Sequence, residues 1–92
     1  MKPTARPKRV PGLAYRVIDG EAVIVLPQAM ELRILSETGS RVWELIDGER
    51  TVGAIGEAIA GEYEVEALQA LRDVGEFLEE LRNVKLITLE GE

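Results

Sequence analysis

The chain has 92 residues, of which 46% are apolar and 30% charged, and its formal net charge is −6. That length supports one domain with a modest core, and the composition is ordinary for a globular protein. It contains no cysteine and no histidine, which excludes disulfides and thiolate chemistry and removes the commonest general base and metal ligand at neutral pH.

Catalytic motifs are correspondingly scarce. We find no serine–histidine pair, no glycine-rich phosphate loop and no metal-ligand spacing. The acidic groups 62–66 and 79–80 lack the ligand spacing of a calcium loop, so we interpret them as solvated faces. We therefore predict a protein that is not an enzyme and needs no cofactor. Because no apolar run is long enough to span a bilayer, we also expect a cytoplasmic protein without a membrane partner.

The N-terminal segment differs from the rest of the chain. Residues 1–12 hold three of the four prolines, and residues 1–16 carry five bases and no acid. Proline has a fixed φ and no N–H, so we expect residues 1–12 to form a flexible basic arm and residues 13–92 to form the single domain. The remaining residues carry six bases against 17 acids, which opposes nucleic-acid binding by the domain itself.

Three strands are predicted next. Residues 15–18 and 21–26 are β-rich runs separated by Asp19-Gly20, which predicts a hairpin with a type I′ turn. The second run is apolar at five successive positions, as expected of a central strand covered on both faces. Pro27-Gln28-Ala29 predicts a break. Residues 30–34 alternate apolar and polar side chains, which predicts a half-buried edge strand and completes a meander.

Helical patterns fill the second half of the chain. Ser36 and Thr51 are predicted N-caps of two short helices separated by Asp47-Gly48, an arrangement typical of a helix-turn-helix. Trp43 lies on the apolar face of the first helix, so we interpret it as a core residue. A longer helix is predicted from residue 66 to about 82, ending where Asn83 can adopt the left-handed conformation. Its predicted apolar stripe is Leu68, Leu71, Val74, Phe77, Leu78 and Leu81. Residues 85–89 could form a short final strand.

In order and spacing, these features resemble the PqqD family, the pyrroloquinoline quinone (PQQ) biosynthesis protein D family, also called RiPP recognition elements. No single segment is specific to that family. The resemblance spans nearly the whole chain and rests on Arg9-Val10-Pro11-Gly12-Leu13, Val23-Ile24-Val25-Leu26-Pro27, Leu35-Ser36-Glu37-Thr38-Gly39, Val42-Trp43, Asp47-Gly48-Glu49-Arg50-Thr51-Val52, Asp73-Val74 and Phe77-Leu78-Glu79-Glu80-Leu81. Two positions depart from the family pattern: Ser36 replaces the usual asparagine, and Lys85 lies near the usual glycine.

This resemblance implies an α+β, winged helix-turn-helix-like fold, with a three-stranded antiparallel meander followed by three helices. It also implies a noncatalytic peptide chaperone for PQQ or another ribosomally synthesised, modified peptide. In the family, the leader segment of a precursor peptide adds as a strand beside the third strand, in a groove shared with the third helix. The domain then presents the precursor to a modifying enzyme such as a radical S-adenosylmethionine (SAM) protein. Carried over by residue, the groove consists of Glu31, Leu32, Arg33, Ile34, Leu35, Leu68, Leu71, Arg72, Gly75 and Leu78.

An exposed edge strand supports the same hypothesis independently, because its unpaired backbone groups can accept another strand. Two alternatives remain open from the sequence. A small DNA-binding winged-helix regulator would rely on the basic arm, since residues 57–66 and the outside of the last helix are mostly acidic. A dimerising subunit is the other alternative, because the apolar second strand could require cover from a second copy.

Overall fold

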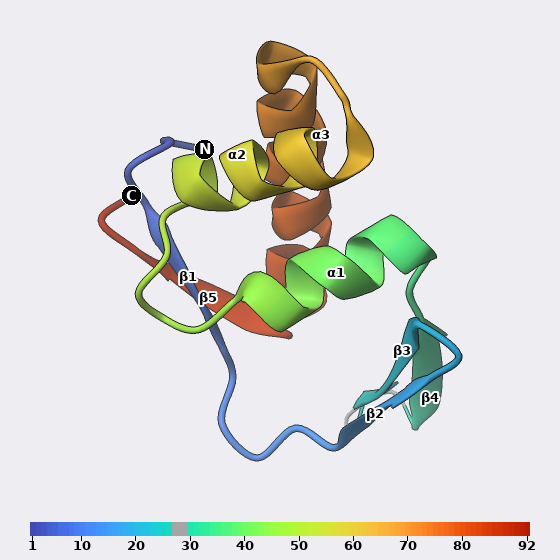
Figure 1. The fold of residues 1–92 in the computed structure, drawn as a ribbon. Helices are drawn as coiled ribbons and strands as arrows, with labels where there is room; N and C mark the ends of the chain where they lie inside the picture. Colours follow the sequence, from blue (N-terminus) through green and yellow to red (C-terminus); the bar gives the residue numbers. More distant parts are fainter. Residues whose placement is uncertain (27–29) are drawn as a thin grey trace.

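A computed structural model describes residues 1–26 and 30–92; the predicted break at residues 27–29 lies outside the described residues. Three helices lie between two small sheets (Figure 1). The elements are β1 (Arg6–Arg9), β2 (Tyr15–Ile18), β3 (Glu21–Leu26), β4 (Glu31–Ile34), α1 (Glu37–Leu45), α2 (Val52–Tyr63), α3 (Ala67–Asn83) and β5 (Ile87–Glu90). Within the described residues, no helix combines the length and apolar character needed to cross a membrane.

The predicted meander is confirmed. Strands β2, β3 and β4 form one antiparallel sheet in that order. Asp19 and Gly20 have φ values of 51° and 81°, as a type I′ turn requires at both central residues. The backbone twist of a type I′ turn matches the right-handed twist of the two strands, so this short local signal determines the first pairing.

The prediction that β3 is covered on both faces is wrong. Its side chains alternate, with Ala22, Ile24 and Leu26 buried and Val25 exposed. The inner face of the sheet, which carries these three buried residues, packs into the core, whereas the outer face is open to solvent. An apolar run therefore indicated a central strand correctly but did not show that only one face of the sheet is covered.

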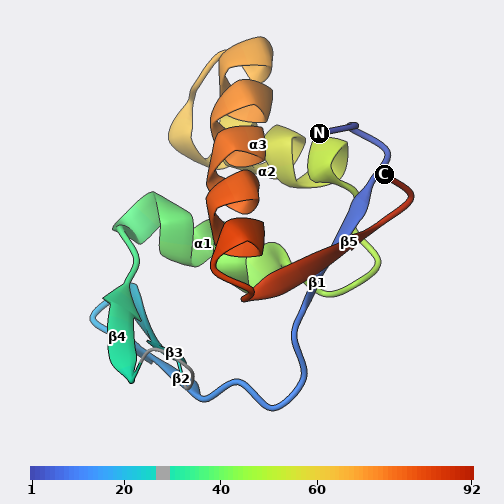
Figure 2. The same cartoon turned by 180° about the vertical axis from the view of Figure 1, so that it is seen from behind.

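Residues 6–9 correct the expectation of a flexible arm. They form β1, which pairs antiparallel with β5, Arg6 opposite Glu90 and Arg9 opposite Ile87. Ala5 and Pro7 are buried. Proline is tolerated here because β1 is an edge strand with one partner, so a missing N–H can face away from the ladder. Figure 2 shows the two ends of the chain lying together along this pair.

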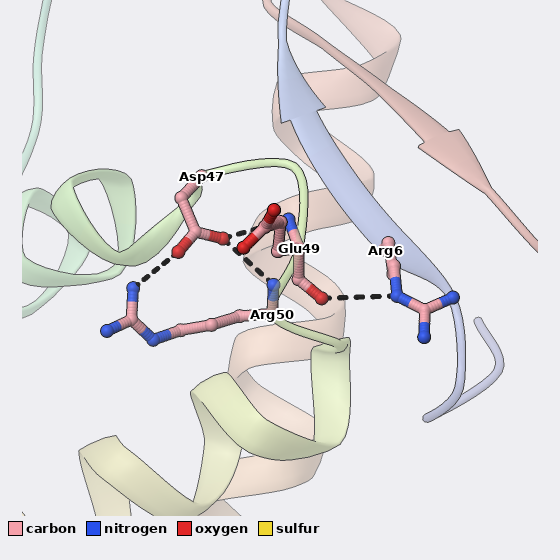
Figure 3. Close-up of polar contacts among 4 residues, drawn as sticks. All are labelled: Arg6, Asp47, Glu49 and Arg50. Carbon is pink, nitrogen blue, oxygen red and sulfur yellow. Dashed lines mark hydrogen bonds and ion pairs between the residues drawn. The ribbon is translucent and has the colours of Figure 1, made fainter.

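Polar contacts hold β1 against the turn between α1 and α2 (Figure 3). The Asp47 carboxylate accepts hydrogen bonds from the N–H groups of Glu49 and Arg50 at 2.9 and 2.8 Å, and Arg50 also forms an ion pair with it. These backbone donors lower the pKa of Asp47. Arg6 Nε donates to the Glu49 carbonyl oxygen at 3.1 Å, so the turn is joined directly to the N-terminal strand.

Both predicted helix caps are confirmed. Ser36 Oγ accepts from the Gly39 N–H and Thr51 Oγ1 accepts from the Ala54 N–H, each at 3.1 Å. Trp43 is fully buried, which confirms its predicted place in the core. Its ring meets the edge of Tyr15 with centroids 5.4 Å apart, and the Arg9 guanidinium lies near both rings. This aromatic cluster joins β1, β2 and α1.

The end of α3 differs from the prediction at Asn83. The left-handed residue is Lys85, with φ 63°. The N–H groups of Lys85 and Leu86 donate to the carbonyl oxygens of Arg82 and Leu81, which is the hydrogen-bond pattern of a Schellman motif. Glycine is the usual residue at this point because a Cβ makes the left-handed conformation costly.

We expect Lys85→Gly to raise the free energy of unfolding by about 1 kcal/mol, because glycine relieves the Cβ strain at φ 63°. Urea unfolding followed by circular dichroism measures this change. Asn83→Gly is the matched control and is expected to be destabilising, because Asn83 is the last residue of α3 and has helical backbone hydrogen bonding. A stabilising Asn83→Gly together with a destabilising Lys85→Gly would contradict this assignment of the helix end.

Candidate functional site

The third strand of the meander, β4, lies at an edge of its sheet. Its inner neighbour is β3, and within residues 1–26 and 30–92 no further strand pairs with it. Such an edge presents backbone N–H and C=O groups that another chain can pair with. The candidate site is therefore made first of backbone atoms, and the register decides which ones are free.

Two backbone hydrogen bonds determine that register. The Leu35 N–H donates to the Ala22 carbonyl oxygen at 2.9 Å, and the Val25 N–H donates toward β2, to Ala14, at 3.0 Å. Because pairs alternate along an antiparallel ladder, Arg33 exchanges hydrogen bonds with Ile24, its partner in register. The N–H and C=O groups of Leu32 and Ile34 therefore point to the outer edge of β4.

Ser40 maintains this register where β3 and β4 separate. The Ala22 N–H donates to Ser40 Oγ at 2.7 Å, and the Ser40 hydroxyl donates to the Leu35 carbonyl oxygen at 3.4 Å. Ser40 is fully buried, so its hydroxyl bridges two backbone groups that would otherwise be unpaired away from water. A side chain from α1 thus replaces one bond of the ladder and positions the end of β4.

The side chains of β4 are arranged differently from the predicted half-buried strand. Leu32 and Ile34 are 65% and 64% exposed, on the outer face of the sheet. Arg33 is half-buried on the inner face, Glu31 is exposed, and only Leu35, just beyond the strand, is buried in the core. The predicted alternation of apolar and polar side chains is present in β4. Its apolar side chains face solvent, however, because the helices pack on the other face of the sheet.

The predicted helix residues lie mostly away from β4. Leu68 is 69% exposed, near the start of α3, and Leu78 is fully buried in the core. Leu71 packs on α2, where a Cβ on Gly56 would lie 3.2 Å from the Leu71 Cα. Leu71, Arg72 and Gly75 line a pocket of about 440 Å³ together with Met1, Pro3 and Val52. The structure therefore brings the five strand residues together but places these three helix residues beside the N-terminus.

A different flank of α3 borders the residues that follow β4. Asp73, Val74 and Phe77 line a pocket of about 540 Å³ with Ser36, Thr38 and Gly39 at the start of α1. Gly39 is needed there, because a Cβ would lie 3.0 Å from the Phe77 ring. Sequence reasoning missed this flank because the apolar stripe of α3 is bordered by two candidate faces. The sequence signals for this flank were Gly39, in the first turn of the first helix, and Phe77, the single phenylalanine of the chain.

A third pocket, of about 410 Å³, connects β4 with the end of α3. Glu31 and Arg33 line it from the strand, and Val84, Lys85 and Leu86 line it from the turn before β5. Leu26 at the end of β3 and residues 10–13, between β1 and β2, complete the lining. The left-handed Lys85 and the inner-face Arg33 thus share one cavity at the side of the candidate edge.

Among the described residues, no group of three or more His, Cys, Asp or Glu side chains is placed to hold a metal ion. The site thus consists of free backbone groups, exposed apolar side chains, two neighbouring pockets and two cations. This arrangement is suited to binding an extended chain.

Comparison with known families identifies the fold. A family model described as "Coenzyme PQQ synthesis protein D (PqqD)" matches residues 21–87, which include β3, β4 and all three helices. The chain belongs to the PqqD family. This confirms the family predicted from the sequence, and the PqqD match includes both β4 and α3. A comparison with curated proteins gave no significant match.

Solved structures with the PqqD-like fold cover nearly the whole chain. The structure "TbiB1 in Complex with the TbiA(beta) Leader Peptide" is 33% identical, with TM-score 0.79 and coverage of 92% of this chain and 96% of that chain. A structure described as "Lasso peptide synthetase B1 complexed with the leader peptide" is 18% identical, with TM-score 0.79 and coverage of 90% and 98%. The PqqD portion of Methylobacterium extorquens PqqCD, described as a functional and stand-alone RiPP recognition element, is 22% identical, with TM-score 0.74 and coverage of 96% and 99%.

These PqqD-like structures confirm the predicted fold class, an α+β chain with a three-stranded meander, three helices and a short C-terminal strand. The PqqD match begins at residue 21, so β1 lies outside it. Of the two departures from the family pattern, Ser36 still caps α1 and Lys85 occupies the left-handed position itself.

Proposed function

We propose that this chain binds the leader segment of a ribosomally synthesised precursor peptide by strand addition at the outer edge of β4, and presents it to a modifying enzyme. The observation that carries the proposal is the outward orientation of the backbone groups of Leu32 and Ile34, in a fold shared with two leader-peptide complexes. Main-chain hydrogen bonds supply affinity in such complexes, and side-chain pockets supply specificity.

The predicted strand residues Glu31 to Leu35 form the backbone side of the proposed groove. On the helix side, we propose that Phe77 and Asp73 contribute in place of Leu71, Arg72 and Gly75, because they line the pocket beside the start of α1. The domain itself acts as a noncatalytic carrier. The chemistry would then belong to a partner such as a radical SAM protein, working on a PQQ precursor or another peptide.

The DNA-binding alternative is weakened by how the basic residues are placed. Arg6 donates to the Glu49 carbonyl oxygen and Arg9 lies against Tyr15 and Trp43, so the two arginines of β1 are not part of a free arm. The exposed outside of α3 carries Asp73, Glu76 and Glu80. An acidic face of this kind repels the phosphate backbone.

Hydrogen exchange tests the proposal at single amides, using a candidate leader peptide sought among the short reading frames that neighbour the gene for this protein. We expect the Leu32 and Ile34 amides to become at least about tenfold more protected when the leader is bound, because they gain hydrogen bonds. The matched control is the other free edge: on β2, the Tyr15 and Val17 amides also point away from β3 and should not change. Protection at β2 alone, or protection of β4 by duplex DNA instead, would overturn the proposal.

A further inference from the structure

Two cations line the pocket beside β4 without ion-pair partners. In the part of the chain that the structure describes, the ion pairs involve Arg41, Arg50 and Arg82, and neither Arg33 nor Lys85. The remaining lining of this pocket of about 410 Å³ is largely apolar, and Glu31 is its one acid. A locally positive cavity is unusual in a chain with a net charge of −6. Arg33 is half-buried and Lys85 is exposed, and a half-buried cation attracts a carboxylate more strongly than a cation in open water.

The backbone at Lys85 is a second, independent observation. This residue has φ 63° at the end of α3, a conformation that glycine adopts without cost. A side chain retained in a strained conformation is a reason to look for a role of that side chain. The Lys85 side chain adds the second positive charge to the pocket that Arg33 lines.

The register of β4 determines what a docked strand presents to that pocket. A residue opposite Arg33 lies on the inner face, the face of Arg33 itself, because directly opposed residues share one face of a sheet. The backbone N–H and C=O groups of Arg33 already pair with Ile24, so they do not bond to the docked residue opposite Arg33. The two residues therefore form a non-hydrogen-bonded pair, in which side chains lie closer together than in a hydrogen-bonded pair. The residues on either side of it lie on the outer face, beside the exposed Leu32 and Ile34.

We infer that the groove selects a peptide with the pattern apolar–acidic–apolar, in which one Asp or Glu side chain lies over Arg33 and Lys85 and its neighbours pack on Leu32 and Ile34. This inference rests on the proposed strand addition at β4 and assigns the chemistry of the docked segment. Charge complementarity supplies specificity for the acidic residue, and cross-strand apolar contacts support the residues beside it.

The test is a displayed library of random peptides about ten residues long, enough to extend past both ends of β4, selected on the full chain. We expect the selected peptides to be enriched in apolar–acidic–apolar triplets. In synthetic copies of the binders, replacing that acid by its amide should weaken binding about threefold to tenfold at low salt. The difference should shrink at about 0.5 M salt, because screening weakens partly exposed ion pairs.

Variants then assign the preference to the two cations. In the double variant Arg33→Gln with Lys85→Gly, selection should still yield binders, but the acidic enrichment at the central position should disappear. Arg72→Gln is the matched control, because Arg72 is an exposed cation that lines the pocket beside the N-terminus instead; its selected peptides should keep the acid. Circular dichroism verifies that each variant is folded, and Lys85→Gly alone should reduce the preference for acid over amide by about half or more.

Each outcome separates this inference from the proposed function. Binders that protect the β4 amides but show no acidic enrichment would overturn the apolar–acidic–apolar pattern and leave strand addition in place. A library that yields no binder protecting β4 would overturn strand addition and this inference together. Retention of the acidic preference in the double variant would show that other groups recognise the acid.

Discussion

Ile34→Pro is expected to give a folded protein that no longer binds a leader peptide, whereas Arg33→Pro is expected to destabilise the domain. Proline removes a backbone N–H. The Arg33 N–H pairs with Ile24 inside the sheet, while the Ile34 N–H points to the outer edge. We expect Arg33→Pro to cost roughly 2–4 kcal/mol of stability, because it breaks the ladder and leaves a carbonyl unpaired. Ile34→Pro should cost little stability but weaken leader binding by about tenfold or more.

Circular dichroism measures folding and calorimetric titration measures binding of the leader. Two controls isolate the amide at the β4 edge. Ile34→Ala shortens the exposed side chain but keeps the N–H, so it should retain most of the binding. Val17→Pro removes an outward amide from β2, the opposite edge, and should leave both folding and binding unchanged. Unchanged affinity in a folded Ile34→Pro variant would argue against strand addition at β4.

Deletion of residues 1–9 is expected to leave the domain largely unfolded at room temperature. Strand β1 is the only described partner of β5, and its loss also removes the buried Ala5 and Pro7. The Val52 and Gly53 N–H groups at the start of α2 donate to the carbonyl oxygens of Ala5 and Pro3 at 2.8 and 2.9 Å. These amides have no partner within the helix. Losses of this kind exceed what a small domain can tolerate when its total stability is about 5–15 kcal/mol.

Thermal and urea unfolding measure the effect of this deletion. The matched control is Lys2→Ala with Lys8→Ala, which removes two exposed charges and keeps the backbone of β1. This double variant should change stability by less than about 1 kcal/mol, because exposed charges contribute little. If the deletion had no larger effect than the double variant, residues 1–9 would be a solvated arm after all.

Features determined within a few residues of chain were predictable from the sequence. The turn at Asp19-Gly20, the caps Ser36 and Thr51 and the burial of Trp43 all follow from local conformational preference or from a single large apolar side chain. The order of such local features also carried the family resemblance. The position of the edge strand was predictable for the same reason, because a meander places its third strand at an edge unless a later segment covers it.

Features that depend on distant parts of the chain required the tertiary structure. A proline-rich basic segment has no local signal for a strand, and β1 forms because β5 returns to it from the other end of the chain. The apolar stripe of α3 indicates that the helix is packed but leaves open which flank meets α2 and which meets the start of α1. The free amides of β4 are determined by hydrogen bonds to β3, and the pocket of Arg33 and Lys85 joins residues from separate elements. The sequence alone determined which segments form elements, because those preferences are local. Only the packing decided which backbone groups and charges remain available to a partner, because that depends on what every other segment has already covered.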